Sequence, residues 1–542
     1  MGTVATLLAE HVSFRCSSVD RIGIRGYVPG LQYEGGLVKF LVNRGFRIPA
    51  PPALNKNHDR LVAELDKLVA STGHEVRRFK RGESKEDIAR PFQDAALDAG
   101  TPGLVLVGKQ QERSSSWRGF IDKKHPMHKP GHPHVTWRRQ SSVPDYWYFY
   151  FADEEWGPAF MCMCSHAPYP AWCCCNGHEW AKRQLVHAGI SFTALDNGLR
   201  SVEDPEAAHR ICSQLGAGHV RDLLGRMTSV IPDPLTPVDR QAGFEWAFSI
   251  AQLEVSDTAV FDQPRQGRAW FEAAIGGHLD LGRPEKVSLV VNRTVRSRGK
   301  NPTPGRFATE VIARDISPQI QIHYKSDKVK AYLKEGKALR VETTINNATD
   351  FNLHKTLNRE NWDALRHLGV DINDRFLAVL GDTNLEPPDP AALEAVVLPT
   401  VHNGQRAPGF RFGEPRTTAL LASVAAFAHV MGGLTNKSLR TQMAALWEPG
   451  YSSAQASYDL RRLRMKGFIE RVDGTNTYRV TAHGLLIAAF LTHLATRVVV
   501  PTLTDLAALS KPTPPATRPV TTAWRNYETE LNRLLRSTRQ VA

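Results

Sequence analysis

The chain has 542 residues, with 68 Lys and Arg against 55 Asp and Glu, and its formal charge at pH 7 is +13. Hydrophobic residues make up 42% of it, which fits packed globular domains and excludes a disordered chain, a collagen-like repeat and a disulfide scaffold. This length accommodates about three or four domains. The positive charge favours an anionic partner, either nucleic acid or a membrane surface.

The N-terminal residues 1–200 predict an α/β domain. The apolar spacing of Asp59–Ala70 is that of a helix with one buried face, and Ser84 is the predicted cap of a second helix that extends to Ala99. Gly103–Gly108 is a short apolar run bounded by glycines, and Tyr146–Phe151 is rich in aromatic residues. Both runs are typical of buried strands.

The middle of the chain predicts a helical segment at 201–282 and then a basic α+β domain at 283–400. The helices of the first are predicted at Asp204–Leu215, His219–Met227, Pro237–Leu253 and Pro264–Ile275. In the second, strand-like sequences lie at 287–292, 307–313, 319–324 and 338–345, and one helix is predicted at Ser326–Glu335. We find no internal repeat in the sequence.

The C-terminal part predicts a winged-helix domain at 401–505, then a Pro-rich linker and an amphipathic helix at 506–542. The predicted fold class is therefore multidomain α/β and α+β. Leu485–Val500 is the most apolar stretch, but its 16 residues include His493 and Arg497, whereas a membrane span needs about 20 apolar residues. We predict no membrane partner, and we expect the helices at 485–500 or 521–537 to form any homodimer interface.

The cysteines and the N-terminal residues indicate the compartment. The first residues do not combine basic side chains with a long apolar run, so they do not resemble a secretion signal. Three of the seven cysteines are consecutive, at 173–175, which does not suit a regular disulfide framework in so large a chain. A cytoplasmic location is the prediction that follows.

The most specific pattern lies in the C-terminal third. Two helices are predicted at Leu434–Leu446 and Ser453–Lys466, with a Pro- and Gly-containing turn between them. Alternating residues then surround Asp473-Gly474, which is a strong hairpin signal. Helix, turn, helix and β-hairpin in this order resemble the winged-helix domain of bacterial DNA-binding proteins, over about 70 residues at 415–485.

This resemblance implies that the second helix and the hairpin contact nucleic acid, with double-stranded DNA as the expected partner. A recognition helix presents polar side chains to base edges, while arginines bind phosphates. The candidate contacts in this domain are Gln455, Tyr458, Arg461, Arg462, Arg464, Arg471 and Arg479. Winged helices also serve as protein–protein modules, and this alternative stays open.

Most of the positive charge lies elsewhere, in residues 283–340. This segment has 14 Lys and Arg against 5 Asp and Glu, so its net charge is +9. A loop that can follow a phosphate backbone carries Arg293, Arg296, Arg298, Lys300 and Arg306. We expect a second nucleic-acid surface here, with a solvated basic face as the alternative. Nearby, Tyr324-Lys325 and the sequence LRVE at 339–342 are similar to a pattern in phage and plasmid rolling-circle initiators.

A group of cysteines and histidines is a candidate zinc site. The proposed ligands are Cys162, Cys164, His166 and His178. Their spacing is not that of a standard Cys-x2-Cys pair, and alternation along a strand places Cys162 and Cys164 on one face. Buried core cysteines are therefore the favoured interpretation.

Carboxylates after strand-like sequences are the candidate catalytic residues. Asp153 follows the aromatic strand, Glu179 lies in the sequence NGHEW, and Asp196 follows ISFTAL. Carboxylates at strand ends can bind Mg²⁺ for phosphoryl transfer or hydrolysis, and turn acids or surface ion pairs are the alternative. Glu254, Asp257 and Asp262 form a further acidic patch with the same alternative.

Together these patterns predict a nucleic-acid-binding protein that handles DNA, as a metal-dependent nuclease, nicking or strand-transfer enzyme. The domains beyond the winged helix motivate an enzyme, because a simple repressor needs far fewer residues. One alternative is a non-enzymatic winged-helix transcriptional regulator whose N-terminal region senses a ligand or partner. Another is a protein-assembly factor that uses the winged helix as a docking module.

Overall fold

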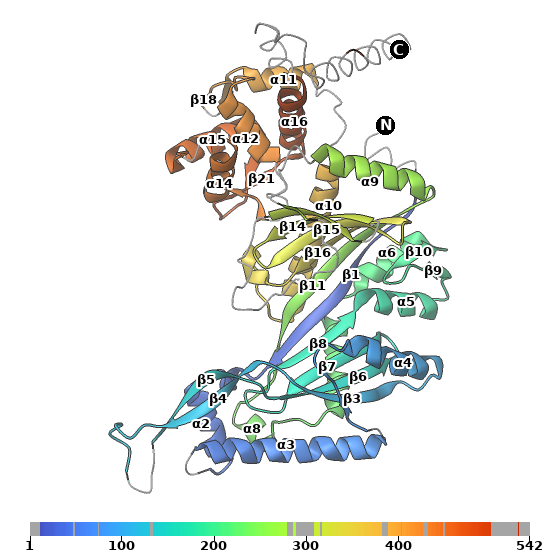
Figure 1. Cartoon of the computed structure of the whole chain (residues 1–542), viewed down its shortest axis with the longest axis vertical. Helices are drawn as coiled ribbons and strands as arrows, with labels where there is room; N and C mark the ends of the chain where they lie inside the picture. Colours follow the sequence, from blue (N-terminus) through green and yellow to red (C-terminus); the bar gives the residue numbers. More distant parts are fainter. Residues whose placement is uncertain are drawn as a thin grey trace, which may run out of the picture.

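The chain is a mixed α/β protein built around one large mixed sheet (Figure 1). The computed structural model describes residues 11–46, 49–73, 75–129, 134–278, 286–288, 308–314, 317–381, 389–402, 404–425, 432–447, 450–499 and 529. Within these residues, every helix is too short or too polar to cross a bilayer.

The large sheet has 12 strands, and β1 (Val12–Tyr27) and β11 (Ala247–Phe261) are antiparallel neighbours at its centre. Outward from β1 come β8 (Ala171–Asn176), β7 (Gly157–Cys164), β6 (Asp145–Asp153), β3 (Gly103–Gln111) and β2 (Arg77–Arg78). Outward from β11 come β16 (Ala338–Ile345), β15 (Asp327–Lys334), β14 (Ser317–Tyr324), β13 (Ala308–Arg314) and β12 (Lys286–Ser288). Only the outermost pair on each side is parallel.

The two halves of the sheet have the same strand order. In each half the first strand along the chain lies at the centre, the second lies at the outer edge, and the rest return toward the centre as an antiparallel meander. The sequence contains no visible repeat, so the two halves share topology without matching residues. Strands that were predicted to belong to three different domains are direct neighbours in this sheet.

Of two predicted helices, Pro237–Leu253 is helical only at its start and Ser326–Glu335 is wrong, because strands occupy the rest of the first segment and nearly all of the second. The segment 237–253 forms only a short helix, α8 (Pro237–Gln241), before β11 begins. Ser326–Glu335 forms β15, in which buried and half-buried residues alternate. In both segments the apolar residues fit a two-residue period as well as a helical one, and long-range pairing decides between them.

Helices cover the sheet along its length (Figure 1). In the N-terminal half they are η1 (Pro29–Leu31), α2 (Glu34–Asn43), α3 (Pro51–Thr72), α4 (Lys85–Asp98), α5 (Gly177–His187), α6 (Pro205–Gln214) and α7 (Ala217–Val230). In the C-terminal half they are α9 (Pro264–His278), η2 (Ala348–Phe351) and α10 (Arg359–Gly381). The Ser84 hydroxyl accepts a hydrogen bond from the Asp87 amide, which confirms the predicted cap of α4.

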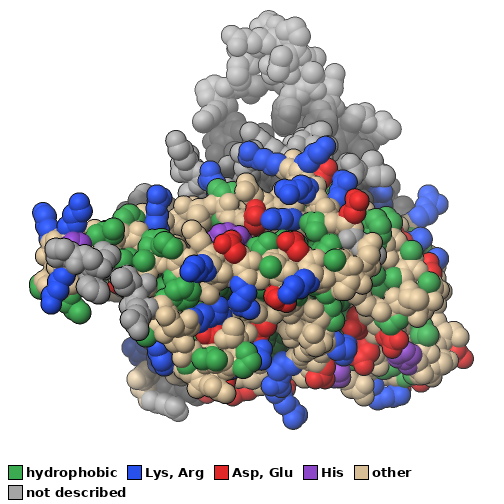
Figure 2. Space-filling model, turned by 90° about the horizontal axis from the view of Figure 1, so that it is seen from below, with side chains coloured by type: hydrophobic (Ala, Val, Ile, Leu, Met, Phe, Trp, Pro, Cys, Tyr) green, Lys and Arg blue, Asp and Glu red, His purple; other side chains and the backbone are tan. Residues whose placement is uncertain are grey.

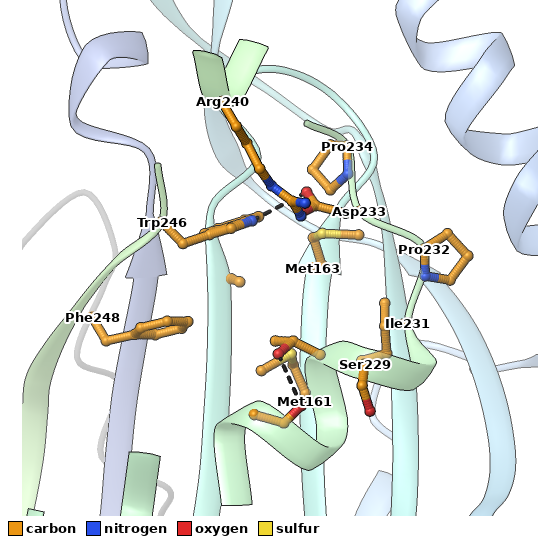
Figure 3. Close-up of a pocket in the computed structure, with 13 residues that line it drawn as sticks. Met161, Met163, Ser229, Ile231, Pro232, Asp233, Pro234, Arg240, Trp246 and Phe248 are labelled. Carbon is orange, nitrogen blue, oxygen red and sulfur yellow. Dashed lines mark hydrogen bonds and ion pairs between the residues drawn. The ribbon is translucent and has the colours of Figure 1, made fainter. Parts of the chain in front are cut away.

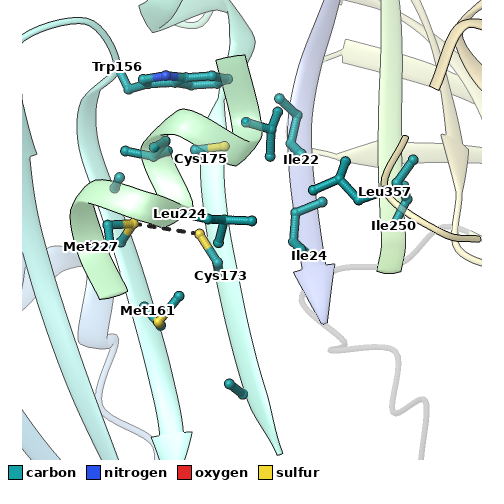
Figure 4. Close-up of a cluster of buried hydrophobic side chains, with 14 of the residues drawn as sticks. Ile22, Ile24, Trp156, Met161, Cys173, Cys175, Leu224, Met227, Ile250 and Leu357 are labelled. Atoms are coloured by element: carbon teal, nitrogen blue, oxygen red, sulfur yellow. Dashed lines mark hydrogen bonds between the residues drawn. The ribbon is translucent and has the colours of Figure 1, made fainter. Parts of the chain in front are cut away.

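The main core lies between the central strands and α7. Figure 4 shows Ile22 and Ile24 of β1 beside Cys173 of β8, with Leu224 and Met227 of α7 packed over them. The sulfur atoms of Cys173 and Met227 are 3.9 Å apart. Because side chains alternate along a strand, the neighbouring Trp172 and Cys174 are left to line a cavity instead of this core.

Before the C-terminal part, two small sheets lie apart from the large one. β9 (Phe192–Ala194) pairs with β10 (Leu199–Val202), and the loop between them approaches the large sheet. β4 (Ser114–Ile121) pairs with β5 (Val135–Ser142) in a hairpin that projects from the molecule (Figures 1 and 2).

The C-terminal part has its own core. It contains α11 (Pro390–Val397), β17 (Thr400–His402), β18 (Gln405–Ala407), α12 (Pro415–Ala425), β19 (Leu434–Thr435), α14 (Asn436–Leu446), α15 (Ser453–Met465), β20 (Ile469–Arg471), β21 (Thr477–Val480), α16 (Ala482–His493) and the π-helical turn η3 (Leu494–Val499). Thr435 and Ser452 cap α14 and α15, and a hairpin follows at the expected turn. Helices and hairpin therefore occur in the order on which the winged-helix resemblance depends.

Candidate functional site: a buried carboxylate cluster

A bulge at the centre of the sheet creates the candidate site. The β1–β11 register shifts between the pairs Val19–Val255 and Ile22–Leu253, so that Asp20 and Arg21 stand opposite Glu254 alone. A bulge of this kind bends the strand and re-aims its side chains. Asp20, Arg21 and Glu254 all line the same cavity as a result.

Three carboxylates from three adjacent strands meet at this bulge. They are Asp20 of β1, Glu254 of β11 and Glu342 of β16, and one oxygen of each lies within 4.8 Å of the others. Asp20 and Glu342 are each 2% exposed. Burying three carboxylates this close together costs free energy unless cations, protons or hydrogen bonds compensate their charges.

Arg340 supplies part of this compensation. Its side chain is fully buried, forms an ion pair with Asp20, and places Nε 3.3 Å from a Glu342 oxygen. Another guanidinium nitrogen lies 3.1 Å from Nε2 of His178, and because arginine only donates, Nε2 must accept. Burial, followed by the positive charge of Arg340, lowers the pKa of His178 to about 3, so this histidine is neutral at pH 7.

The pKa values of Glu254 and Glu342 are shifted in opposite directions. Burial, then the hydrogen bond and charge of Glu342, raises the pKa of Glu254 to about 9. Burial acts to raise the pKa of Glu342 as well, but the hydrogen bond from Glu254 and the cations Lys330 and Arg340 hold it well below its usual range. Nζ of Lys330 is 2.5 Å from Oε1 of Glu342. At pH 7 the cluster therefore contains a protonated Glu254 beside an ionised Glu342.

A loop and a helix terminus close one side of the cluster. The Asn197 side chain donates to Asp20, and its backbone carbonyl accepts from Arg340. Asn176, which caps α5, donates to the Asn197 side chain at 2.9 Å. Asp196 adopts a left-handed backbone conformation, with φ at 34°, and binds Lys334 at 3.1 Å. The β9–β10 loop is thus held against the sheet by ion pairs and amide contacts.

The cluster opens into a cavity of about 580 Å³. The carboxylates that line it are Asp20, Glu86, Glu179, Asp196, Glu254 and Glu342, and the cations are Arg21, Arg90, Lys330 and Lys334. Aromatic side chains of Tyr150, Phe160, Trp172 and Tyr332 complete its wall. Acids exceed bases here, so the cavity suits a cation, or an anion that arrives together with one.

The structure brings two of the three predicted catalytic carboxylates to this cavity. Glu179 and Asp196 line it, and Glu179 forms an ion pair with Lys182 at 2.8 Å. Asp153 is elsewhere, because it binds Arg226 at 2.9 Å and accepts hydrogen bonds from the backbone of the turn that follows β6. Asp153 therefore has a local structural role.

The predicted zinc ligands do not meet. Cys162 and Cys164 are buried free thiols on β7, as expected of core cysteines. The His166 ring stacks on His58 with ring centroids 3.8 Å apart, whereas His178 belongs to the carboxylate cluster. Among the described residues, the group with metal-ligand geometry is Asp20, Glu254 and Glu342.

The predicted nucleic-acid contacts of α15 fall into two sets. Tyr458, Arg461 and Arg464 are exposed. Arg462 is engaged internally, because it donates to the backbone carbonyls of Pro408 and Gly409 and stacks on the Phe410 ring. Burial lowers its pKa from the usual value.

The remaining predicted contacts are similarly divided. Gln455 belongs to the cap of α15, and Arg471 donates to Thr475 and Asn476 within the hairpin, whereas Arg479 is exposed. Arg293, Arg296, Arg298, Lys300 and Arg306 lie outside the described residues, as does the predicted helix at 521–537 except residue 529. Within 485–500, the α16 residues Ile487, Ala488, Ala489 and Leu491 are buried in the C-terminal core.

A second cavity, of about 380 Å³, lies between β7, the end of α7 and the start of β11 (Figure 3). Trp246 and Phe248 project into it from one side and face Met161 and Met163, with nearly parallel aromatic rings. At its polar end Asp233 accepts from the Trp246 indole at 3.2 Å and pairs with Arg240. Its wall is mostly apolar, in contrast to the carboxylate cavity.

Asp20 is the residue of the site that sequence reasoning missed. It stands in the β1 sequence SSVDRIGI, where an acid close to the apolar residues Val19, Ile22 and Ile24 was the available signal. Glu254 and Glu342 had each been noted, but in separate patterns. Comparison with protein-family models, curated proteins and solved structures finds no match to this chain.

Proposed function

We propose that this protein binds nucleic acid, with duplex DNA as its partner, and that Asp20, Glu254 and Glu342 hold a divalent cation for phosphodiester cleavage or transfer. The observation that carries the proposal is the convergence of these three carboxylates on one cavity lined by lysine and arginine. Oxygen-only ligand sets suit Mg²⁺ or Mn²⁺ and not Zn²⁺.

The proton on Glu254 supports a cation at this position. Burial, and then the neighbouring carboxylates of Glu342 and Asp20, raise the pKa of Glu254 so that it stays protonated at neutral pH. A divalent cation among the three oxygens would replace that proton and offset the same repulsion. Bound there, it would polarise a phosphoryl oxygen and lower the pKa of a coordinated water.

The surrounding residues suit a phosphodiester substrate. Arg21 lines the same cavity and can balance phosphate charge beside the carboxylates. The aromatic wall, which includes Trp172, offers a stacking surface for a base. The exposed Arg461 and Arg464 of α15 support DNA binding by the helix-and-hairpin unit.

Cleavage of labelled duplex and single-stranded DNA with Mg²⁺ or Mn²⁺, against an EDTA control, tests this proposal. We expect metal-dependent cleavage or strand transfer that falls at least 100-fold in Glu342→Gln and Asp20→Asn, because each variant removes a ligand charge. Glu245→Gln is the matched control, since Glu245 is an exposed acid outside the cavity.

Binding of Mn²⁺ alone, followed by electron paramagnetic resonance, separates the metal site from the reaction. Wild-type protein should bind Mn²⁺ at the cluster, and Asp20→Asn should lose this binding while thermal unfolding shows that it remains folded. A folded wild-type protein that neither binds Mn²⁺ nor processes any DNA would refute the assignment.

The apolar cavity favours a second candidate, a winged-helix regulator that senses a small ligand in its N-terminal region. Trp246 and Phe248 give the cavity a flat aromatic wall suited to a planar, largely apolar molecule. A screen of planar aromatic compounds by tryptophan fluorescence tests it. Quenching that is lost in Phe248→Ala, together with altered DNA affinity, would support the regulator over the enzyme.

A further inference from the structure

The β4–β5 hairpin is a basic arm outside the large sheet. Its two strands form a separate sheet and pair without interruption from Ser114–Ser142 to Ile121–Val135. Figure 2 shows the hairpin projecting from one side of the molecule, with Lys and Arg side chains along it. The arm comprises β4, β5 and residues 122–129, since 130–133 lie outside the described residues.

Two tryptophans in the middle of the strands anchor one face of the arm on the rest of the protein. Trp117 and Trp137 are 9% and 3% exposed and belong to the main core. The Trp117 indole donates to the Leu31 carbonyl at 3.0 Å, and the Trp137 amide donates to Glu34 at 2.7 Å. The arm is therefore a defined structural element with one anchored face.

The opposite face presents two arginines side by side. Arg118 and Arg138 are direct partners in the β4–β5 register, so both point away from the tryptophan face, and both are exposed. Within the part of the chain that the structure describes, neither has a carboxylate at ion-pair distance. Like charges directly opposite each other on a sheet destabilise it. An anion bound between them would remove that cost.

The rest of the arm has the same character. Residues 113–139 contain 7 Lys and Arg against a single Asp, a net charge of +6. Lys123, Lys124 and Lys129 are exposed beyond the strands, and Phe120 is 38% exposed on the arginine face. Ser116, Thr136 and Gln140 share that face by alternation. Hydrogen-bonding side chains on either side of an arginine pair suit phosphates and base edges better than they suit lipid.

We infer that this arm is a second DNA-binding element, which lies in a groove of duplex DNA with Arg118 and Arg138 on backbone phosphates. A two-stranded ribbon fits the major groove, and eight residues per strand span roughly 26 Å, or about 8 base pairs. The inference rests on the proposed DNA-binding function, but it does not depend on the carboxylate cluster.

The test is binding of the full chain to a 30-base-pair duplex, measured by fluorescence anisotropy over a range of KCl concentrations. The variant is Arg118→Gln with Arg138→Gln, the charge-conserving variant is Arg118→Lys with Arg138→Lys, and the matched control is Arg200→Gln with Arg221→Gln. Loss of two phosphate contacts should weaken binding roughly 10- to 100-fold at 0.1 M salt and lower the salt slope by about 1.8. The lysine variant should keep most of the slope.

The melting temperature separates DNA binding by the arm from a purely structural role. The glutamine variant should melt no lower than wild type, because it removes a repulsion between the two arginines. A lower melting temperature with unchanged DNA binding would overturn the inference in favour of a structural role. DNA affinity and slope equal to wild type, with binding to phosphatidylserine vesicles lost, would overturn it in favour of a membrane surface. If wild-type protein does not bind DNA, the proposed function is refuted as well. If wild-type protein binds DNA and the arm variant binds it equally well, only the inference about the arm is refuted.

Discussion

The carboxylate cluster and the β4–β5 arm use positive charge in opposite ways. In the cluster, Arg340 and Lys330 are buried or half-buried, and the carboxylates of Asp20 and Glu342 neutralise them. On the arm, Arg118 and Arg138 face each other in solvent. A cation that already has a carboxylate partner organises the protein, whereas an exposed one without a carboxylate partner is available to a ligand.

This contrast changes the meaning of the charge distribution. The segment 283–340 has a net charge of +9, yet several of its cations form ion pairs, among them Lys330, Lys334 and Arg340 with Glu342, Asp196 and Asp20. The arm has the smaller net charge, +6 over residues 113–139, but the arginines of its outer face are exposed. Net charge in a stretch of sequence does not show which cations remain available.

The largest effect should come from removing a paired, buried cation. Arg340→Met would leave Asp20 and Glu342 buried without their guanidinium partner, so we expect the free energy of unfolding to fall by about 3–5 kcal/mol. Urea denaturation followed by tryptophan fluorescence measures it. Arg221→Met, at an exposed position, should change stability by less than about 0.5 kcal/mol. If both substitutions lower the free energy of unfolding equally, paired and unpaired cations do not differ in their contribution to stability.

A smaller effect concerns the proton on Glu254. The raised pKa of about 9 means that a divalent cation must displace this proton at any pH below it. The apparent Mn²⁺ affinity should therefore rise about tenfold per pH unit between pH 6 and 8, as expected for one released proton. Isothermal titration calorimetry in two buffers of different ionisation enthalpy counts that proton. In Glu254→Gln the affinity should be lower and nearly independent of pH, and an unchanged pH slope would place the titrating group elsewhere.

Local signals predicted several elements correctly. Ser84 before α4 and the Asp473-Gly474 turn depend on neighbouring residues, and both have the expected roles. Glu179 and Asp196 were identified because they follow strand-like sequences, and they do line the cavity. The centre of the site was not predictable in this way. Asp20 and Arg340 are 320 residues apart in sequence, and only the pairing of β1, β11 and β16 brings them together.

The strands at the centre escaped prediction for the same reason. β11 and β15 have apolar spacings that fit two periods, and their neighbours in the sheet come from distant parts of the chain. The bulge that exposes Asp20 and Arg21 to the cavity depends on how β1 registers against β11, which no local sequence pattern specifies. Long-range register is thus what separates the predicted part of the site from the rest.

The smallest effects test the same contrast within one helix. On α15, Arg462 donates to two backbone carbonyls, whereas its neighbours Arg461 and Arg464 are exposed. Arg462→Ala should lower the stability of the C-terminal part by about 1–2 kcal/mol through these lost hydrogen bonds, with any loss of DNA affinity following from that. Arg461→Ala with Arg464→Ala should leave the melting temperature within about 1 °C of wild type and reduce DNA affinity roughly tenfold or more. If the double variant binds DNA as wild type does, α15 is not the helix that contacts DNA, and the exposed charge on the arm becomes the main candidate for that role.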